Sequence, residues 1–559
     1  MQPPKSHKSD IECLKSVTTP ESITMGIGTR QCHFFRKQIF DRISPIAYDV
    51  AYKYLKITRE FDYVRANQFL GSLSSELKIK DLNLTWDKNE LKAFAAEKAS
   101  SLMKDISGLS KCMAVPICKS RISKYGLVLP HDYSDSEIIE TCCSNKYWFV
   151  QVKSIAAQKL ENTRRSLDLV HNSVSPYCSN SRLRDYQWEQ EQSMEFMKNN
   201  SFCNANGELI SMLDAYNANV SNPAIRRAEL MVRIKGTEEY SKLLEHCGVF
   251  YTITAASKYH SHYKSGKSNP KYAGFDVKEA NEHLCNQWKK ARAQFHRDGL
   301  EVYGLRVVEP HHDGTPHWHL MLFMPVEQME AVTQILKGYA FEHEPNEKGA
   351  SKSRFKAEKI DPKKGSAQDY IAKYICKNID GEFIDEDKYG NDAKLSSQRI
   401  RAWSSLFRIR QFQFIGGPSV SLWRQLRKLE ITEDGAIEDI RVAADSSDWL
   451  SYLVMMGGHN IPRSERPLSL EYELSLKQQY QNIQDSKLSN HAYNRVPKYI
   501  RSFCGLTPLP DKGWFLISSP PDQVVIAPNL QVGCNVDEGA GGNRRSWGGA
   551  PSGDGPPIP

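Results

Sequence analysis

The stretch EPHHDGTPHWHLMLFM, residues 309–324, has the pattern of two β-strands joined by a short turn. The pair Asp313-Gly314 favours a tight turn between them. In a strand, alternate side chains share a face, so His317 and His319 point one way and Trp318 points the other way, where it can pack against helices. The stretch therefore predicts an antiparallel hairpin with a histidine-bearing face.

The segments around this hairpin alternate between strand and helix patterns. We expect strands at 248–257, 302–309, 317–324 and 353–360, and helices at 276–297, 325–342 and 367–379. Gly299 is placed to end the helix that precedes it. The order β-α-β-β-α-β followed by a helix is typical of a ferredoxin-like or RRM-like domain. The predicted fold class is α+β, with a central antiparallel sheet that carries helices on one face.

The composition of the whole chain excludes several protein classes. The chain has 559 residues, 13 cysteines and a net charge of +8, and its mean hydropathy is −0.54. An odd number of scattered cysteines argues against a disulfide framework. No apolar run reaches the roughly 18 residues that a membrane-spanning helix needs, and residues 1–10 lack a signal peptide's apolar core. We expect a soluble intracellular protein without a membrane partner.

Four regions are expected along the chain. Residues 1–240 read as a mostly helical region that could bind DNA or a partner, with helices at 45–57 and 223–235. Ser44 is placed to cap the first of these helices, and Gly236 to end the second. Residues 245–381 form the predicted catalytic domain, residues 382–515 a C-terminal region that could contact DNA, and residues 516–559 a Gly- and Pro-rich tail.

The histidine face suggests a metal site. Two imidazoles about 7 Å apart on one strand can both reach a single divalent ion. Glu309 ends the partner strand, and the turn brings it back beside His317. Two histidines with one carboxylate suit Mg²⁺ or Mn²⁺. The alternative third ligands His311, His312 and Asp313 lie in the turn. The plainest interpretation has no metal, with two histidines that simply lie on a hydrated face.

The helix at 367–379 carries two tyrosines, Tyr370 and Tyr374, one turn apart on one face. Its apolar residues form a separate stripe, which consists of Ile371, Ile375 and Ile379. Lys373 and Lys377 share the tyrosine face, although two amphipathic core tyrosines would also fit the pattern. A phenol has a pKa near 10, and neighbouring lysines or a metal would favour its ionised form. Such a centre suits transesterification of a phosphodiester by tyrosine.

Three ordered motifs resemble those of one family. They are FYTITAAS at 250–257, EPHHDGTPHWHLMLF at 309–323 and YIAKYICKNIDG at 370–381, with flanking similarity at 222–233 and 409–427. Together they resemble the replication gene A proteins of temperate tailed bacteriophages, which are two-tyrosine rolling-circle initiators of the HUH superfamily. The resemblance covers at least residues 222–427.

This resemblance implies a set of roles and partners. His317 and His319 would bind the divalent metal, and Tyr370 and Tyr374 would form 5′-phosphotyrosyl intermediates. The protein would nick single-stranded origin DNA in the cytoplasm of the bacterial host, with a host helicase and a host polymerase as partners. No Walker A sequence is present in the chain, so it would not unwind DNA alone. Glu309 as third ligand rests on hairpin geometry.

Other interpretations remain open at this stage. A two-tyrosine rolling-circle transposase would use the same centre. A conjugative relaxase is less favoured, because it usually has its tyrosine before the histidines in the chain, whereas here the tyrosines follow them. A non-catalytic origin-binding protein would need neither tyrosine. A zinc site at Cys112, Cys118, Cys142 and Cys143 has awkward spacing. The segments 352–364 and 403–427 could contact DNA, or they could be a solvated strand and a core strand.

Overall fold

The structure is a computed structural model that describes residues 19–517, apart from 131–132, 205, 362, 364, 384, 388–389, 433, 477–492 and 511–512. The chain divides into two compact units, Met1–Val170 and His171–Pro559. The predicted tail at 516–559 lies outside the described residues except for 516–517. The four-region division of the chain stays a prediction.

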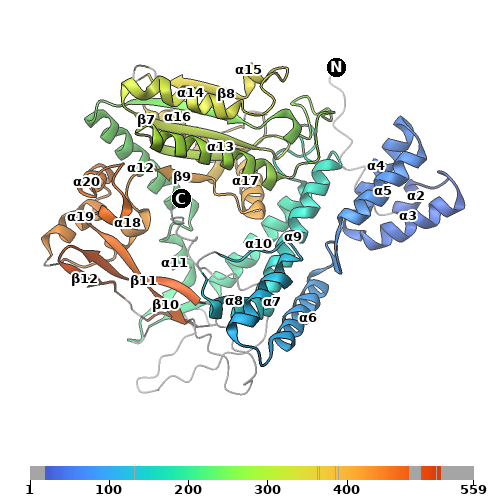
Figure 1. The fold of residues 1–559 in the computed structure, drawn as a ribbon, viewed down its shortest axis with the longest axis horizontal. Coiled ribbons are helices and arrows are strands. Elements are labelled where there is room, and N and C mark those ends of the chain that lie inside the picture. Colours follow the sequence, from blue (N-terminus) through green and yellow to red (C-terminus); the bar gives the residue numbers. More distant parts are fainter. Residues whose placement is uncertain are drawn as a thin grey trace. The chain divides into compact units, whose positions relative to one another are not determined.

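The first unit consists of helices (Figure 1) and of one short hairpin. Its elements are α2 (Pro20–Ile23), α3 (Arg30–Arg42), η1 (Ser44–Ile46), α4 (Ala47–Glu60), α5 (Tyr63–Glu76), β1 (Lys78–Ile79), β2 (Leu82–Asn83), α6 (Lys88–Ile106), α7 (Lys111–Ser123), α8 (Asp135–Cys142) and α9 (Asn145–Ser166). Two apolar cores hold it together, one around Tyr54 and one around Trp148. The predicted cap at Ser44 is wrong, because Ser44 starts the 3-10 turn η1 and Ile46 is the residue that precedes the first turn of α4.

A five-stranded antiparallel sheet forms the centre of the second unit (Figure 1). Its strands are β5 (Cys247–Thr254), β6 (Tyr303–Pro310), β7 (Pro316–Met324), β8 (Phe355–Lys359) and β9 (Phe412–Ile415), in the spatial order β8-β5-β7-β6-β9. The connecting helices are α13 (Val277–Arg297) and α14 (Met329–Ala340). Gly299 ends α13 with φ +65°, as the sequence predicts. β9 shows that the segment around Phe412 belongs to the core sheet.

Helices cover both faces of this sheet, which corrects the expectation of helices on one face. Trp318 lies against Leu284 of α13 and Leu336 of α14. On the opposite face, Met321 and Leu305 belong to one apolar core with the isoleucine stripe of α16 (Ala367–Ile379) and with α12 (Pro223–Leu243). The isoleucine stripe of α16 is apolar, and so is the part of the histidine face that carries Met321 and Leu305. The second layer of helices forms because these two apolar surfaces must be buried together.

The second unit contains further elements outside the central sheet and the helices named so far. They are α10 (Asn180–Lys198), β3 (Ser201–Cys203), β4 (Leu209–Ser211), α11 (Met212–Asn217), η2 (Ser257–Tyr259), η3 (Val326–Gln328), α15 (Ala350–Ser353), α17 (Ala393–Phe407), α18 (Val420–Leu426), α19 (Gly435–Asp445), α20 (Trp449–Met455), η4 (Arg463–Glu465), β10 (Ser469–Leu476), β11 (Tyr493–Ser502), β12 (Gly505–Pro508) and β13 (Phe515–Ile517). The mixed α+β class is confirmed. None of the described helices has the length and apolar character needed to cross a membrane.

Gly236 does not end its helix, contrary to the sequence prediction. α12 continues through it to Leu243. A Cβ atom at Gly236 would lie 2.7 Å from the Cβ atom of Trp449 and 2.8 Å from the backbone nitrogen of Leu450. The missing side chain therefore lets α20 approach α12 closely, and this packing outweighs glycine's poor helix propensity.

We expect Gly236→Ala to lower the free energy of unfolding by about 1–3 kcal/mol, because the added methyl group would push α20 away from α12. Gly338→Ala is the matched control, since Gly338 also lies within a helix and a Cβ atom there would meet nothing within 4 Å. That control should gain up to about 1 kcal/mol from helix propensity. Urea unfolding of both variants measures the difference, and equal changes would contradict the packing argument.

Candidate active site

The register of the sheet places two threonines beside the two histidines. Thr254 pairs with His317 and Thr252 pairs with His319 across β5 and β7. The hydroxyl of Thr254 lies 3.0 Å from Nδ1 of His317, and the hydroxyl of Thr252 lies 3.1 Å from Nδ1 of His319. Both histidines are buried. A hydrogen bond at Nδ1 fixes the orientation of an imidazole ring, which is the usual support of a metal-binding histidine.

Glu309 completes this row from the other neighbouring strand. It pairs directly with His317 across β6 and β7, and only 2% of its side chain is exposed. Its carboxylate accepts a short hydrogen bond from Nδ2 of Asn378 and lies 3.3 Å from Nζ of Lys377. The Oε2 atom of Glu309 lies 3.7 Å from Nε2 of His319. These partners offset the cost of burying a carboxylate.

The tyrosine helix α16 lies over this row. Its bounds agree with the sequence prediction, and Ser366 caps it in a reciprocal capping box with Asp369. The ring centre of Tyr374 lies 4.2 Å from that of His319. Tyr370 lies one turn earlier, and its ring centre is 6.5 Å from that of Phe250. The structure therefore brings Tyr374 against the histidine face and leaves Tyr370 closer to its edge.

The two lysines of α16 have different neighbours. Nζ of Lys373 lies 5.1 Å from the ring centre of Tyr374, whereas Lys377 contacts Glu309 and the ring of Tyr177. Burial, followed by the negative charges of Glu309 and Glu358, raises the pKa of Tyr374 to about 12. The surroundings of Tyr374 thus make its phenol harder to ionise than an ordinary tyrosine.

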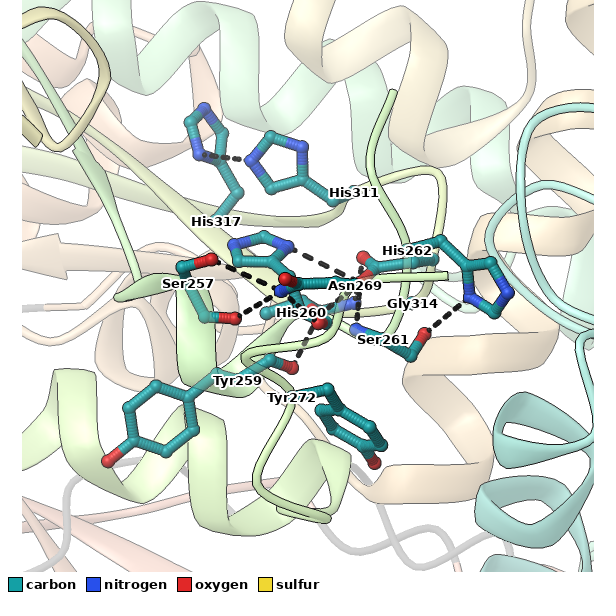
Figure 2. A network of polar contacts seen from close by, with 12 residues as sticks. Ser257, Tyr259, His260, Ser261, His262, Asn269, Tyr272, His311, Gly314 and His317 are labelled. Atoms are coloured by element: carbon teal, nitrogen blue, oxygen red, sulfur yellow. Dashed lines mark hydrogen bonds and ion pairs between the residues drawn. The ribbon is translucent and has the colours of Figure 1, made fainter. Parts of the chain in front are cut away.

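The turn residues that rival Glu309 have separate surroundings. Nε2 of His311 lies 3.0 Å from Nδ1 of His317 (Figure 2). Asp313 is fully buried and accepts hydrogen bonds from the backbone of Ser261 and from Thr315, so it shapes the turn. His312 is buried too. Of the three, His311 lies within direct reach of the predicted ligands.

The donor types fit a divalent cation, although the ligands are not gathered around one point. Among the described residues, no group of three or more His, Cys, Asp or Glu side chains is arranged to hold a metal ion, and this includes the four cysteines considered for zinc. Two ligands at right angles on one ion, each about 2.1 Å from it, lie about 3 Å apart. The 3.7 Å between His319 and Glu309 is somewhat longer, so small side-chain shifts would be needed.

Sequence reasoning missed the residue that joins Glu309 to the rest of the fold. Asn378 is 1% exposed, and its Oδ1 accepts a hydrogen bond from Nε2 of Gln411, 3.1 Å away. Gln411 in turn accepts a hydrogen bond from Ser404. Its spacing in the sequence could have indicated that Asn378 belongs to the site, because it lies four residues after Tyr374 on the same helix face.

We expect Asn378→Ala to lower the free energy of unfolding by about 1–3 kcal/mol, because Glu309 would lose its short hydrogen bond in a buried place. Urea unfolding measures this loss. Asn199→Ala removes an exposed asparagine and should change stability by less than about 0.5 kcal/mol. Equal stability of the two variants would show that Asn378 does not support the carboxylate.

We expect Tyr374 to react slowly with iodine at pH 8, because a pKa of about 12 leaves about a hundredfold less phenolate than an ordinary tyrosine has. Glu309→Gln removes a negative charge, lowers the pKa of Tyr374 and so speeds this reaction. Mass spectrometry of the Tyr374 peptide measures the rate. Glu342→Gln, a change two residues beyond the end of α14, is the control, and an unchanged rate in Glu309→Gln would exclude the charge effect.

Comparison with known proteins gives consistent matches. The model of the bacteriophage replication gene A protein family matches residues 91–382, just over half of the chain. The chain is 38% identical to the replication gene A protein of Escherichia phage 186 over 58% of this chain and 49% of that protein. It is 41% identical to a probable replication protein of Pseudoalteromonas phage PM2 over 59% of this chain and 52% of that one.

A probable replication endonuclease from a prophage-like region of Salmonella paratyphi A is 32% identical over 62% of this chain and 46% of that protein. The chain thus spans about half the length of the curated relatives that it matches. No solved structure matches. The family match covers the histidine hairpin and both tyrosines, and the chain therefore belongs to the bacteriophage replication gene A protein family.

Proposed function

We propose that this protein is a site-specific single-strand DNA endonuclease and strand transferase that nicks a phage replication origin and so initiates rolling-circle replication. The observation that carries this proposal is the position of Tyr374. Its ring lies against His319, which in turn lies 3.7 Å from the buried carboxylate of Glu309. A phenol beside an imidazole and carboxylate row is a suitable arrangement for attack on a phosphodiester.

The proposed step exchanges one phosphate ester for another. The phenol oxygen of a tyrosine attacks the scissile phosphorus, the bond to the 3′ oxygen breaks, and the 5′ phosphate becomes linked to the tyrosine. The phenol loses a proton, and the leaving 3′ oxygen gains one and becomes a hydroxyl group that a polymerase can extend. The energy of the phosphodiester is kept in the phosphotyrosyl bond, so rejoining needs no ATP.

The proposed cofactor is Mg²⁺ or Mn²⁺, held by His317, His319 and Glu309. When bound, such an ion draws charge from the phosphate and orients it. The residues around it have their own tasks. Thr252 and Thr254 orient the two imidazoles through Nδ1, and Asn378 and Lys377 hold the carboxylate.

Two tyrosines allow a second cleavage while the first remains linked to DNA. Tyr370 and Tyr374 lie one turn apart on α16, so either phenol is carried by the same helix. Because Tyr374 lies against His319 and Tyr370 lies nearer the edge, the two positions are not equivalent. An initiator that both opens and closes a circle needs two such strand transfers.

The fold supports the same proposal. Four strands of the central sheet lie in the spatial order β8-β5-β7-β6, and α13 and α14 are the two helices that connect them. A ferredoxin-like HUH domain would have the same strand order and the same two connecting helices. β7 is central and carries both histidines. The relatives are named replication proteins or replication endonucleases, which favours a replication role over transposition. Host helicase and host polymerase are the proposed partners, in the host cytoplasm.

We expect a covalent protein–DNA adduct when the protein is incubated with Mn²⁺ and single-stranded oligonucleotides that tile its own gene and the flanking genome. Label on the 3′ side of the nick should migrate with protein on a denaturing gel. EDTA should abolish the adduct. The double variant Tyr370→Phe/Tyr374→Phe should abolish it too, because no phenol would remain to attack.

The control is Tyr339→Phe on α14, a helix on the opposite face of the sheet, and this variant should form the adduct like wild type. Each single variant, Tyr370→Phe or Tyr374→Phe, should retain some adduct. Cleavage without any adduct would mean that water is the nucleophile, and an adduct in the double variant would exclude both tyrosines.

A further inference from the structure

A cleft of about 490 Å³ adjoins the histidine face. Thr254 and His311 line it, and both also contact His317. The cleft therefore begins where the proposed catalytic centre ends. Its size lies within the range of pockets that hold one small ligand or one nucleotide.

One wall of the cleft belongs to a loop, residues 257–275, that its own hydrogen bonds hold in shape (Figure 2). The side-chain amide of Asn269 donates to the backbone oxygens of Ser257 and His260. Asp313 accepts a hydrogen bond from the backbone of Ser261 and lies 3.3 Å from Nδ1 of His260. The wall is thus anchored both to itself and to the turn of the histidine hairpin.

The composition of this loop is one-sided. Residues 257–275 contain four lysines, two histidines and three tyrosines, with no aspartate or glutamate. Two of the lysines are neutralised, because Lys258 lies 3.6 Å from Glu344 and Lys271 lies 3.5 Å from Glu347. Within the part of the chain that the structure describes, Lys264 and Lys267 form no ion pair, and both are exposed.

The exposed groups gather at one tight turn. The backbone nitrogen of Gly266 donates to Tyr263, and that of Tyr263 donates to Lys267, so the tip of the loop consists of residues 263–267. Tyr263 and Lys264 line the cleft, and the Tyr263 ring is exposed. Lys348 lines the cleft as well. A single cleft thus offers an aromatic face with cations beside it.

We infer that this cleft and its loop form a binding site for single-stranded DNA, which seats a nucleotide next to the scissile phosphate. A base would stack on Tyr263, and the phosphates beside it would contact Lys264 and Lys267. Aromatic side chains interleaved with cations are what single strands require, whereas a duplex hides the faces of its bases. This inference rests on the proposed function, because it takes the scissile phosphate to lie at the histidine face.

The test measures binding without cleavage. The probe is a fluorescein-labelled oligothymidylate of about 20 nucleotides, which is longer than one such site needs. It is titrated in EDTA at several salt concentrations. Tyr263→Ala should weaken binding at least about fivefold, through the loss of one stacked base. Lys264→Ala and Lys267→Ala should each lower the slope of log affinity against log salt by about 0.7.

Lys289→Ala/Lys337→Ala is the matched control, because it removes two exposed lysines from α13 and α14. It should leave both the affinity and the salt slope unchanged, and melting temperatures should show that every variant is folded. In addition, 5-bromodeoxyuridine in the probe should crosslink to a peptide within 257–275. Loop variants that bind like wild type, or crosslinks only outside this loop, would overturn the inference.

The outcome is separate from that of the adduct experiment. If the loop variants lose affinity while wild type forms no adduct, the DNA-binding site stands and the proposed nuclease function fails. If wild type forms the adduct and the loop variants bind normally, the nuclease function stands and the DNA-binding loop fails.

Discussion

The hydrogen bond from Asn378 to the buried carboxylate of Glu309 is the interaction on which the centre depends. A carboxylate with 2% exposure costs several kcal/mol to bury unless it has partners. Its partners Asn378 and Lys377 both come from α16, so the need to satisfy one charge on β6 also fixes the helix over the sheet. Once α16 is placed in this way, Tyr374 necessarily lies against His319.

The same placement makes the two tyrosines unequal. The Tyr374 ring packs against Phe250 and His319, and burial, together with the charge of Glu309, raises the pKa of its phenol to about 12. Tyr370 lies one turn farther from that carboxylate. Equal spacing on a helix therefore does not give equal chemistry, since the environment differs from one turn to the next.

Local patterns in the sequence were enough for the hairpin, the order of elements and the bounds of α16, because periodicity and turn residues act over a few positions. They failed where distant parts of the chain decide. Gly236 reads as a helix end, but it is a contact point for Trp449, more than 200 positions away. The second helix layer and the role of Asn378 likewise depend on partners far along the chain. The catalytic roles of the tyrosines and histidines stay predictions, since geometry alone brings side chains together without showing a reaction.

The charges of the centre indicate why a divalent ion belongs to the proposal. Glu309 and Lys377 largely neutralise one another at 3.3 Å, so this pair offers little net attraction to a phosphodiester. The phenol of Tyr374 is also hard to ionise in this place. A bound phosphate would add a further negative charge and make ionisation harder still. Two positive charges placed beside His319 would oppose both obstacles at once, which is why the proposed chemistry requires the ion more than it requires the lysines.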